Sequence, residues 1–278
     1  MPNQWVSNYS KDILIRKLHK TNFFWSSKMK NLLAGLIATL ALSANAYAAT
    51  IVVGTDAGFA PYEFKDPKTN EIVGFDIDLI KATIEATGNE AKIQNMQFAG
   101  LIPALQTNMI DVAASGMTIT PERLKQIAFS DPYYEIGGLV MVVQDKKKGQ
   151  YSVYEDLENK RVCAQIGSTG AIQVGEIKGA KLAAFDQIGE AFMELKMGGC
   201  EAVIVDKIVT EYYFAHKGGD GLYMVPRKGS SGKFNGFGIA KNNKEMLALI
   251  NKGLKTIKEN GTYDKIYTKW FGHAPEKK

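Results

Sequence analysis

Short β-branched or apolar runs alternate with amphipathic stretches along most of this chain, and no other feature restricts its fold more. A strand is predicted at 51–53 and a helix at 76–87, whose apolar residues recur at helical spacing and whose end is marked by Gly88. The alternation continues with strands predicted at 92–96 and 110–114. A chain that repeats strand and helix in this way is predicted to adopt an α/β fold.

The second half of the chain repeats this style with its own set of elements. Strands are predicted at 139–143, 161–165, 181–185, 202–205 and 222–225, and helices at 169–176, 188–197 and 207–216. Two more helices, at 244–259 and 263–271, end the sequence. This second group of strands and helices indicates a second α/β layer rather than the extension of a single sheet.

The first 48 residues have the layout of a secretory signal. Two lysines precede an apolar run at 32–42, and a small-x-small cleavage pattern follows that ends at Ala48. The apolar core holds about 11 residues, against the roughly 20 that span a bilayer, which argues against a membrane anchor. We therefore expect a periplasmic protein cleaved after Ala48, with residues 1–28 an extension upstream of Met29.

The basic character of the sequence belongs to that leader. The whole chain has a formal net charge of +5. Residues 1–48 hold six basic side chains and one acidic one, which also gives +5, so the remaining 230 residues are neutral. Because a nucleic-acid-binding protein needs positive charge on its folded body, we expect no nucleic-acid partner.

The two cysteines, Cys163 and Cys200, are separated by 37 positions. They lack the second pair and the C-x-x-C spacing that zinc and redox sites use. In an oxidising compartment a single structural disulfide is expected, and two buried free thiols are the alternative.

Two predicted strand-to-helix junctions have the composition of anion-binding sites. In 115–123, Thr120 is suited to cap a helix whose first turn contains Arg123. The guanidinium would lie beside free backbone N–H groups and grip a carboxylate with two hydrogen bonds. In 167–170, hydroxyls and glycines follow a strand and open a helix. Either segment could also serve the fold alone, as caps and turn glycines usually do.

Acidic and aromatic side chains also follow predicted strands. Asp206 ends an apolar strand, where a carboxylate at the carboxyl edge of a sheet is placed to bind an ammonium group. Capping of the next helix is the alternative role. Asp56 and Phe59 follow the first strand and Phe98 follows another, so the aromatic rings either belong to the core or cover part of a small ligand.

The sequence offers little support for catalysis. Beyond the leader the only histidines are His216 and His273, and neither lies beside a nucleophile motif. The sequence contains no H-E-x-x-H, G-x-S-x-G or Walker A pattern. We therefore expect a protein that is not an enzyme and that holds no metal and no cofactor.

Eight short motifs occur in a characteristic order: GTD (54–56), FAPYEF (59–64), GFDIDL (74–79), LIPAL (101–105), GMTITPER (116–123), FSDPYY (129–134), NGTY (260–263) and KWFG (269–272). With them the chain resembles the family 3 periplasmic solute-binding proteins, which deliver polar amino acids to ABC importers. That group includes the glutamine-, histidine- and lysine/arginine/ornithine-binding proteins. The resemblance covers essentially the whole mature chain.

The resemblance implies the type II periplasmic binding protein fold, in which two α/β lobes joined by a two-segment hinge close around a ligand. Lobe 1 would comprise 50–133 and 238–278, and lobe 2 would comprise 138–232. The hinge segments would be 134–137 and 233–237. We expect a monomer whose ligand selects the closed form that the membrane permease reads.

The resemblance also implies how the ligand's α-groups are held. Arg123 would pair with the α-carboxylate, helped by the hydroxyl and backbone of Thr118 and by the backbone N–H of Thr169. Asp206 and the carbonyl of Gly116 would accept hydrogen bonds from the α-ammonium. The two lobes would thus each supply half of the site.

For the ligand's side chain, the resemblance implies a sandwich between Phe59 and Phe98, with Asp56 at the polar end. Glutamine-binding members have a lysine where this chain has Gln165 and a histidine where it has Val205. Losing a cation there removes repulsion toward a cationic ligand. We therefore expect arginine or lysine first, glutamine or histidine next, and no acidic amino acid.

Two other functions are compatible with such a scaffold. A dehydratase-type enzyme needs a general acid in the cleft, and the carboxylates placed there, Asp56 and Asp206, already have binding roles. The ligand-sensing domain of a receptor would be followed by a transmembrane helix, and none is predicted after Phe271.

Overall fold

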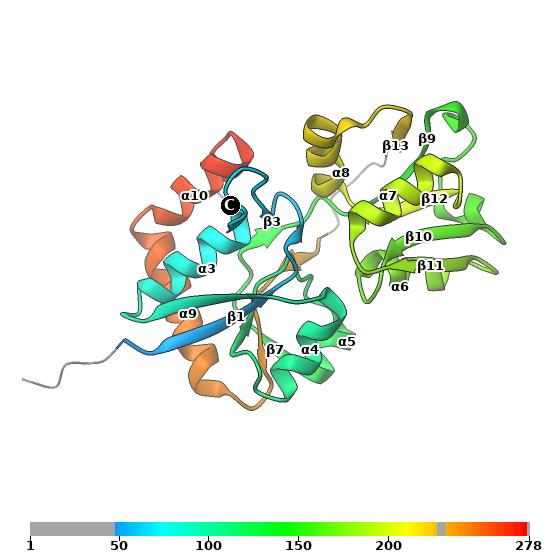
Figure 1. Ribbon diagram of the computed structural model, residues 1–278. Coiled ribbons are helices and arrows are strands. Elements are labelled where there is room, and N and C mark those ends of the chain that lie inside the picture. The colour runs from blue at the N-terminus through cyan, green and yellow to red at the C-terminus, as the bar shows by residue number, and fades with distance from the viewer. Residues whose placement is uncertain (1–47, 227–231, 277–278) are drawn as a thin grey trace, which may run out of the picture. The chain divides into compact units, whose positions relative to one another are not determined.

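The computed structural model describes residues 48–226 and 232–276. The predicted leader, apart from its last residue, lies outside these residues, as does 227–231 of the predicted lobe 2. Within the described residues, no helix is both long and apolar enough to cross a membrane. The fold contains two five-stranded sheets, each with helices on both faces (Figure 1).

The first sheet has the strand order β5-β1-β6-β15-β7. It comprises β1 (Thr50–Thr55), β5 (Glu90–Asn95), β6 (Val112–Ala113), β7 (Ile127–Phe129) and β15 (Gly238–Ala240). β1 pairs in parallel with β5 and β6, whereas β15 runs antiparallel to both β6 and β7. A strand from late in the chain therefore completes a sheet that is begun by the earliest strand. We call the body around this sheet lobe 1.

Helices α3 (Phe75–Glu85) and α9 (Lys244–Glu259) cover one face of the first sheet, and α10 (Thr262–Phe271) packs beside them (Figure 1). Their shared core buries apolar side chains at helical spacing in the helices and at alternate positions in β1, namely Ile51, Val53, Ile80, Ile84, Ile250, Leu254 and Ile257. Helix α4 (Phe98–Gln106) covers the other face with Leu101 and Leu105, and α5 (Pro121–Gln126) precedes β7.

The second sheet has the strand order β11-β10-β12-β9-β13. It comprises β9 (Leu139–Gln144), β10 (Arg161–Gln165), β11 (Lys181–Phe185), β12 (Ala202–Asp206) and β13 (Leu222–Val225). β10 pairs in parallel with β11 and β12, and β9 pairs antiparallel with β12 and β13. We call the body around this sheet lobe 2.

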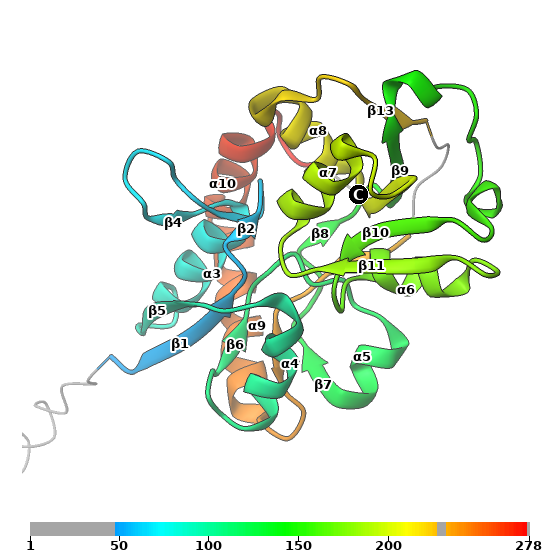
Figure 2. The same cartoon turned by 45° about the vertical axis from the view of Figure 1, so that its right-hand side comes forward.

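Alternate residues of the second sheet enter two separate cores. Val162 and Ala164 pack with α6 (Thr169–Glu176), while Cys163 packs with α7 (Ile188–Met197), so the two helices lie on opposite faces (Figure 2). Short 3₁₀ turns η1 (Asp145–Lys147) and η2 (Tyr154–Leu157) separate β9 from β10.

Helix α8 (Lys207–Tyr213) follows β12 and is shorter than the helix predicted at 207–216. The last part of the predicted helix lies in a π-helical turn, η3 (Phe214–Gly218), in which the hydrogen-bonding pattern is wider than in an α-helix. The rings of Tyr212 in α8 and His216 in η3 stack with their centroids 4.1 Å apart, so they join the α-helix to the π-helical turn.

The described residues also form two smaller sheets. β2 (Gly58–Phe59), β3 (Glu63–Lys65) and β4 (Ile72–Val73) form an antiparallel sheet beside α3. β8 (Tyr134–Glu135) pairs antiparallel with β14 (Phe234–Asn235), which brings together the two chain segments that run between the lobes.

Cys163 and Cys200 form a disulfide whose Cα atoms are 6.1 Å apart. It joins the centre of β10 to the turn before β12. The expected disulfide is therefore confirmed, and the alternative of two free thiols is wrong.

Candidate functional site

One cavity brings together eight of the nine residues that the sequence predicts to bind ligand. Its lining is Phe59, Phe98, Gly116, Thr118, Arg123, Gln165, Ser168, Thr169 and Asp206. The first five belong to lobe 1 and the others to lobe 2. Both lobes therefore contribute polar groups to one site.

Arg123 is positioned by the first turn of α5. The Thr120 hydroxyl caps that helix by accepting a hydrogen bond from the Arg123 backbone N–H at 3.2 Å. Arg123 is 5% exposed. Its guanidinium donates to the Thr118 carbonyl at 2.7 Å and to the Gly167 carbonyl of lobe 2 at 3.1 Å. It also lies 5.2 Å from the centre of the Phe98 ring. Burial lowers the pKa of Arg123 to about 10, which leaves it charged at neutral pH.

Asp206 ends β12 and faces the same cavity with 7% of its surface exposed. It occupies the N-cap position of α8, but its side chain makes no capping hydrogen bond. Within the described chain, its Oδ1 is buried without a hydrogen-bond partner. Burial raises the pKa of Asp206 to about 7, although the charge of Arg123 opposes the rise. The capping alternative is therefore not what the structure shows, and a buried acceptor remains for a ligand's donor.

Gly116 adopts a left-handed conformation, with φ of 53°. A Cβ there would lie 3.1 Å from the Tyr62 ring and 3.3 Å from the Phe59 ring, so the packing also favours glycine. Its N–H donates to Asp76 Oδ2 at 2.7 Å, and the same oxygen accepts from the Tyr133 hydroxyl at 2.6 Å. Burial raises the pKa of Asp76 to about 7. Asp76 thereby fixes the peptide that directly precedes the Gly116 carbonyl, a predicted ligand contact.

Asp56 does not line the cavity but lies behind Gln165, which does. Its Oδ2 accepts from the Phe98 backbone N–H at 3.1 Å and from Gln165 Nε2 at 2.8 Å, while its Oδ1 accepts from Gln187 Nε2 at 2.6 Å. Burial raises the pKa of this 1% exposed carboxyl, and the three hydrogen bonds work against that rise. Both glutamines belong to lobe 2, so Asp56 is held across the two lobes.

Thr169 is the first residue of α6 and lies at the cavity through close packing of that helix. A Cβ on Gly170 would lie 2.2 Å from the Ile204 carbonyl oxygen, so glycine is needed for α6 to approach β12. The Ser168 hydroxyl caps α6 by accepting from the Ala171 N–H at 3.1 Å.

Ser168, which lines the cavity, lies in the predicted anion-binding segment 167–170, whereas sequence reasoning missed two residues of this region: Gln187 on Asp56 and Asp76 behind Gly116. Gln187 lies two residues after the strand β11, at the edge where Gln165 ends β10, and that position is a usable signal. Asp76 is an acidic residue at the start of an apolar helix, which signals a buried acceptor less clearly.

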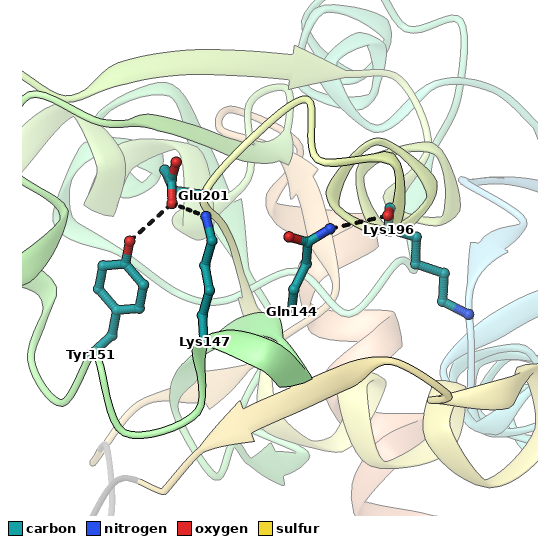
Figure 3. Close-up of polar contacts among 5 residues, drawn as sticks. All are labelled: Gln144, Lys147, Tyr151, Lys196 and Glu201. Atoms are coloured by element: carbon teal, nitrogen blue, oxygen red, sulfur yellow. Dashed lines mark hydrogen bonds and ion pairs between the residues drawn. The ribbon is translucent and has the colours of Figure 1, made fainter.

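A second polar cluster lies at the other end of β12, where Glu201 pairs with Lys147 and accepts from the Tyr151 hydroxyl at 2.9 Å (Figure 3). Nearby, Gln144 Nε2 donates to the Lys196 carbonyl at 3.1 Å. The Lys147 hydrogen bond lowers the pKa of Glu201, and burial raises that of Tyr151 to about 12. These groups satisfy one another, so the cluster ties the loop after β9 to β12.

No group of three or more His, Cys, Asp or Glu side chains in the described part of the chain could hold a metal ion. The donors and acceptors of the cavity are instead those that a small zwitterion needs.

Two α/β lobes that jointly line a small polar cavity define a substrate-binding protein of the type II periplasmic class. The chain belongs to the bacterial extracellular solute-binding proteins, family 3, whose model matches residues 51–273. That family places the protein outside the cytoplasm, in the periplasmic or extracellular space.

Its relatives include amino-acid-binding proteins of ABC transporters. The arginine-binding extracellular protein ArtP of Bacillus subtilis is 36% identical over 225 residues, covering 80% of this chain and 86% of ArtP. The ABC transporter arginine-binding protein 1 of Escherichia coli is 36% identical over 247 residues, covering 87% of this chain and 98% of that protein. A solved ancestral arginine-binding protein bound to arginine is 44% identical with a TM-score of 0.76, covering 81% of this chain and 99% of the other.

Proposed function

We propose that this protein captures a basic L-amino acid, arginine or lysine, by hinge closure and delivers it to the permease of an ABC importer. The observation that carries the proposal is the pair Arg123 and Asp206, a buried cation from lobe 1 and a buried carboxyl from lobe 2 that face one small cavity. An α-amino acid carries the two complementary charges on adjacent groups.

The α-carboxylate would bind the Arg123 guanidinium, whose planar fork suits two parallel hydrogen bonds. The Thr118 hydroxyl and the Thr169 backbone N–H, at the start of α6, would supply further donors. The α-ammonium would bind Asp206 Oδ1 and the Gly116 carbonyl. Each half of this arrangement comes mainly from one lobe, so tight binding requires closure.

The ligand's side chain would lie between Phe59 and Phe98 and point toward Gln165 and Asp56. Asp56 is hydrogen-bonded only by neutral groups among the described residues, so its negative charge is not neutralised by a protein cation. A cationic tail therefore gains attraction there, and an acidic tail is repelled. Neutral glutamine and histidine rank next.

The relatives support this ranking. Two of them are named for arginine, and an ancestral arginine-binding protein has been solved with arginine and with glutamine. One similar structure, 39% identical with a TM-score of 0.72, is an ancestral amino acid-binding protein described as a precursor of cyclohexadienyl dehydratase. We propose binding rather than catalysis for this chain, because its buried carboxyls are placed to hold the ligand's ammonium and side chain.

We propose that the moving parts are lobe 1 (50–133 and 238–278) and lobe 2 (138–232), with hinge segments 134–137 and 233–237. The paired strands β8 and β14 lie in these two segments, which suits a two-strand hinge. We also propose cleavage after Ala48, two residues before β1 begins, to release a periplasmic monomer.

Isothermal titration of refolded, ligand-free protein against the twenty amino acids tests the proposal. We expect the tightest binding for arginine or lysine, weaker binding for glutamine and histidine, and none for glutamate. Glutamate binding more tightly than arginine would contradict the charge argument, and no heat with any amino acid would contradict the function itself.

A further inference from the structure

Gln187 reaches from lobe 2 onto the carboxylate of Asp56 without touching the cavity itself. It lies between β11 and α7, and its backbone N–H donates to the Glu190 carboxylate at 3.2 Å, which fixes where the side chain starts. The side-chain amide donates to Asp56 Oδ1 at 2.6 Å, whereas Gln165 and the Phe98 N–H use Oδ2. Each oxygen of Asp56 is thus oriented separately.

The amide of Gln187 passes through a gap left by Gly58. An ideal Cβ on Gly58 would lie 1.6 Å from Gln187 Oε1 and 2.8 Å from its Cδ. Gly58 is not among the glycines with positive φ, so its backbone does not require glycine. A methyl group at position 58 would therefore have to displace the end of the Gln187 side chain, so the absence of a side chain there leaves room for its contact with Asp56.

The chemistry of Gln187 suits a selective role. An amide donates a hydrogen bond but carries no charge, so it holds the Asp56 carboxylate in place and leaves its negative charge for the ligand. A lysine at the same position would pair with that charge and repel a cationic ligand.

We propose that Gln187 is a positioning residue for the ligand's side chain. When the lobes close, the Gln187 amide passes Gly58 and binds the Asp56 carboxylate. The amide orients this carboxylate without neutralising its charge, and the site therefore remains selective for cationic amino acids. This inference rests on the proposed capture of arginine or lysine. It adds a residue outside the cavity lining that acts through Asp56.

The selectivity test compares arginine and glutamine binding by titration calorimetry. We expect Gln187→Lys to weaken arginine binding at least tenfold while glutamine binding changes less than threefold, so that the ratio of the two affinities falls. Gln187→Met, which keeps the side chain's length without its donor, is expected to lower the same ratio less strongly. Gln150→Lys, the same charge change at an exposed position of lobe 2, is the control and should leave the ratio unchanged.

The closure test is a double-mutant cycle between positions 58 and 187. We expect Gly58→Ala alone to lower the arginine-to-glutamine affinity ratio as Gln187→Met does, because its methyl group displaces the Gln187 amide from Asp56. In a Gln187→Ala background, where the obstruction is gone, Gly58→Ala should change affinity less than threefold. Gly189→Ala, at a position with no atom within 4 Å of the added Cβ, is the matched control.

The outcomes separate this inference from the proposed function. Wild-type protein that binds no cationic amino acid overturns the function. Wild-type protein that binds arginine, combined with an unchanged arginine-to-glutamine ratio in Gln187→Lys and Gln187→Met, overturns the role of Gln187 alone. Additive effects in the cycle overturn the passage of its amide past Gly58.

Discussion

Replacing Arg123 by lysine tests the centre of the site, because lysine keeps the positive charge and removes the planar fork. Two hydrogen bonds, of 2.7 Å to the Thr118 carbonyl and 3.1 Å to the Gly167 carbonyl, fix the orientation of the Arg123 guanidinium. Its remaining N–H donors therefore point in fixed directions. A lysine ammonium would give the ligand carboxylate one contact in place of two and would lose the link to Gly167. The expected effect is weaker binding without loss of the fold.

The magnitude follows from the hydrogen bonds that are lost. One hydrogen bond involving a charged group contributes roughly 1.5–3 kcal/mol, and Arg123→Lys loses about one such bond to the ligand. Since each 1.4 kcal/mol is about tenfold in Kd, arginine should bind roughly 10- to 150-fold more weakly. Arg123→Ala leaves the ligand's carboxylate unpaired in a buried site, for which about 3–5 kcal/mol, or about 150-fold or more, is expected.

Titration calorimetry measures these affinities, and thermal unfolding of the same samples reports on the fold. Arg161→Lys serves as the control, because Arg161 forms a partly exposed ion pair with Glu194 at 2.6 Å on the surface of lobe 2, outside the cavity lining. If arginine binds to Arg123→Lys within threefold of the wild-type Kd, the guanidinium does not hold the ligand carboxylate and the site assignment is wrong.

Two predictions concern stability. Cys163→Ser combined with Cys200→Ser removes a disulfide that links residues 37 positions apart. The loss of this cross-link increases the entropy of the unfolded chain, so the free energy of unfolding should fall by about 4 kcal/mol. Equal urea midpoints for oxidised wild type and the double variant would rule this out. Burial raises the pKa of Asp76 to about 7, above its value in the unfolded chain. Because the folded state then binds a proton that the unfolded state releases, the free energy of unfolding falls as pH rises between roughly 4 and 7. This group contributes a fall of up to about 1.4 kcal/mol per pH unit. Urea unfolding at several pH values should show a smaller decline for Asp76→Asn than for wild type, and identical slopes would contradict the assignment.

The larger elements could be predicted from the sequence because their signals are local. α9 matches the helix predicted at 244–259, since Ile250, Leu254 and Ile257 recur at helical spacing and Asn243 caps the first turn. β10 and β13 likewise match their predicted bounds, because each contains a short apolar run, VCA in β10 and LYMV in β13. Such patterns do not depend on distant partners.

The small strands could not be predicted because they depend on pairing. β2, β3 and β4 contain two or three residues each, too few for an alternating pattern to be recognised. β15 has three residues and pairs with strands more than 100 positions earlier. Its formation is decided by long-range contacts that no local pattern contains.

The site was predictable to the extent that motifs mark it. Arg123 and Asp206 lie at junctions whose composition suggests binding, and the structure brings them to one cavity. The hydrogen bond between Gln187 and Asp56 joins residues 131 positions apart, and neither neighbouring sequence indicates the other. The use of neutral amides on a buried carboxylate therefore becomes visible only in three dimensions.

The insertion of β15 between β6 and β7 sets an order in which the chain can fold during synthesis and export. β7 pairs only with β15 among the described strands, so residues 127–129 have no sheet partner until residues 238–240 have emerged. The second sheet, by contrast, is encoded without interruption between Leu139 and Val225. Lobe 2 can therefore complete its sheet while β7 of lobe 1 still lacks its partner strand.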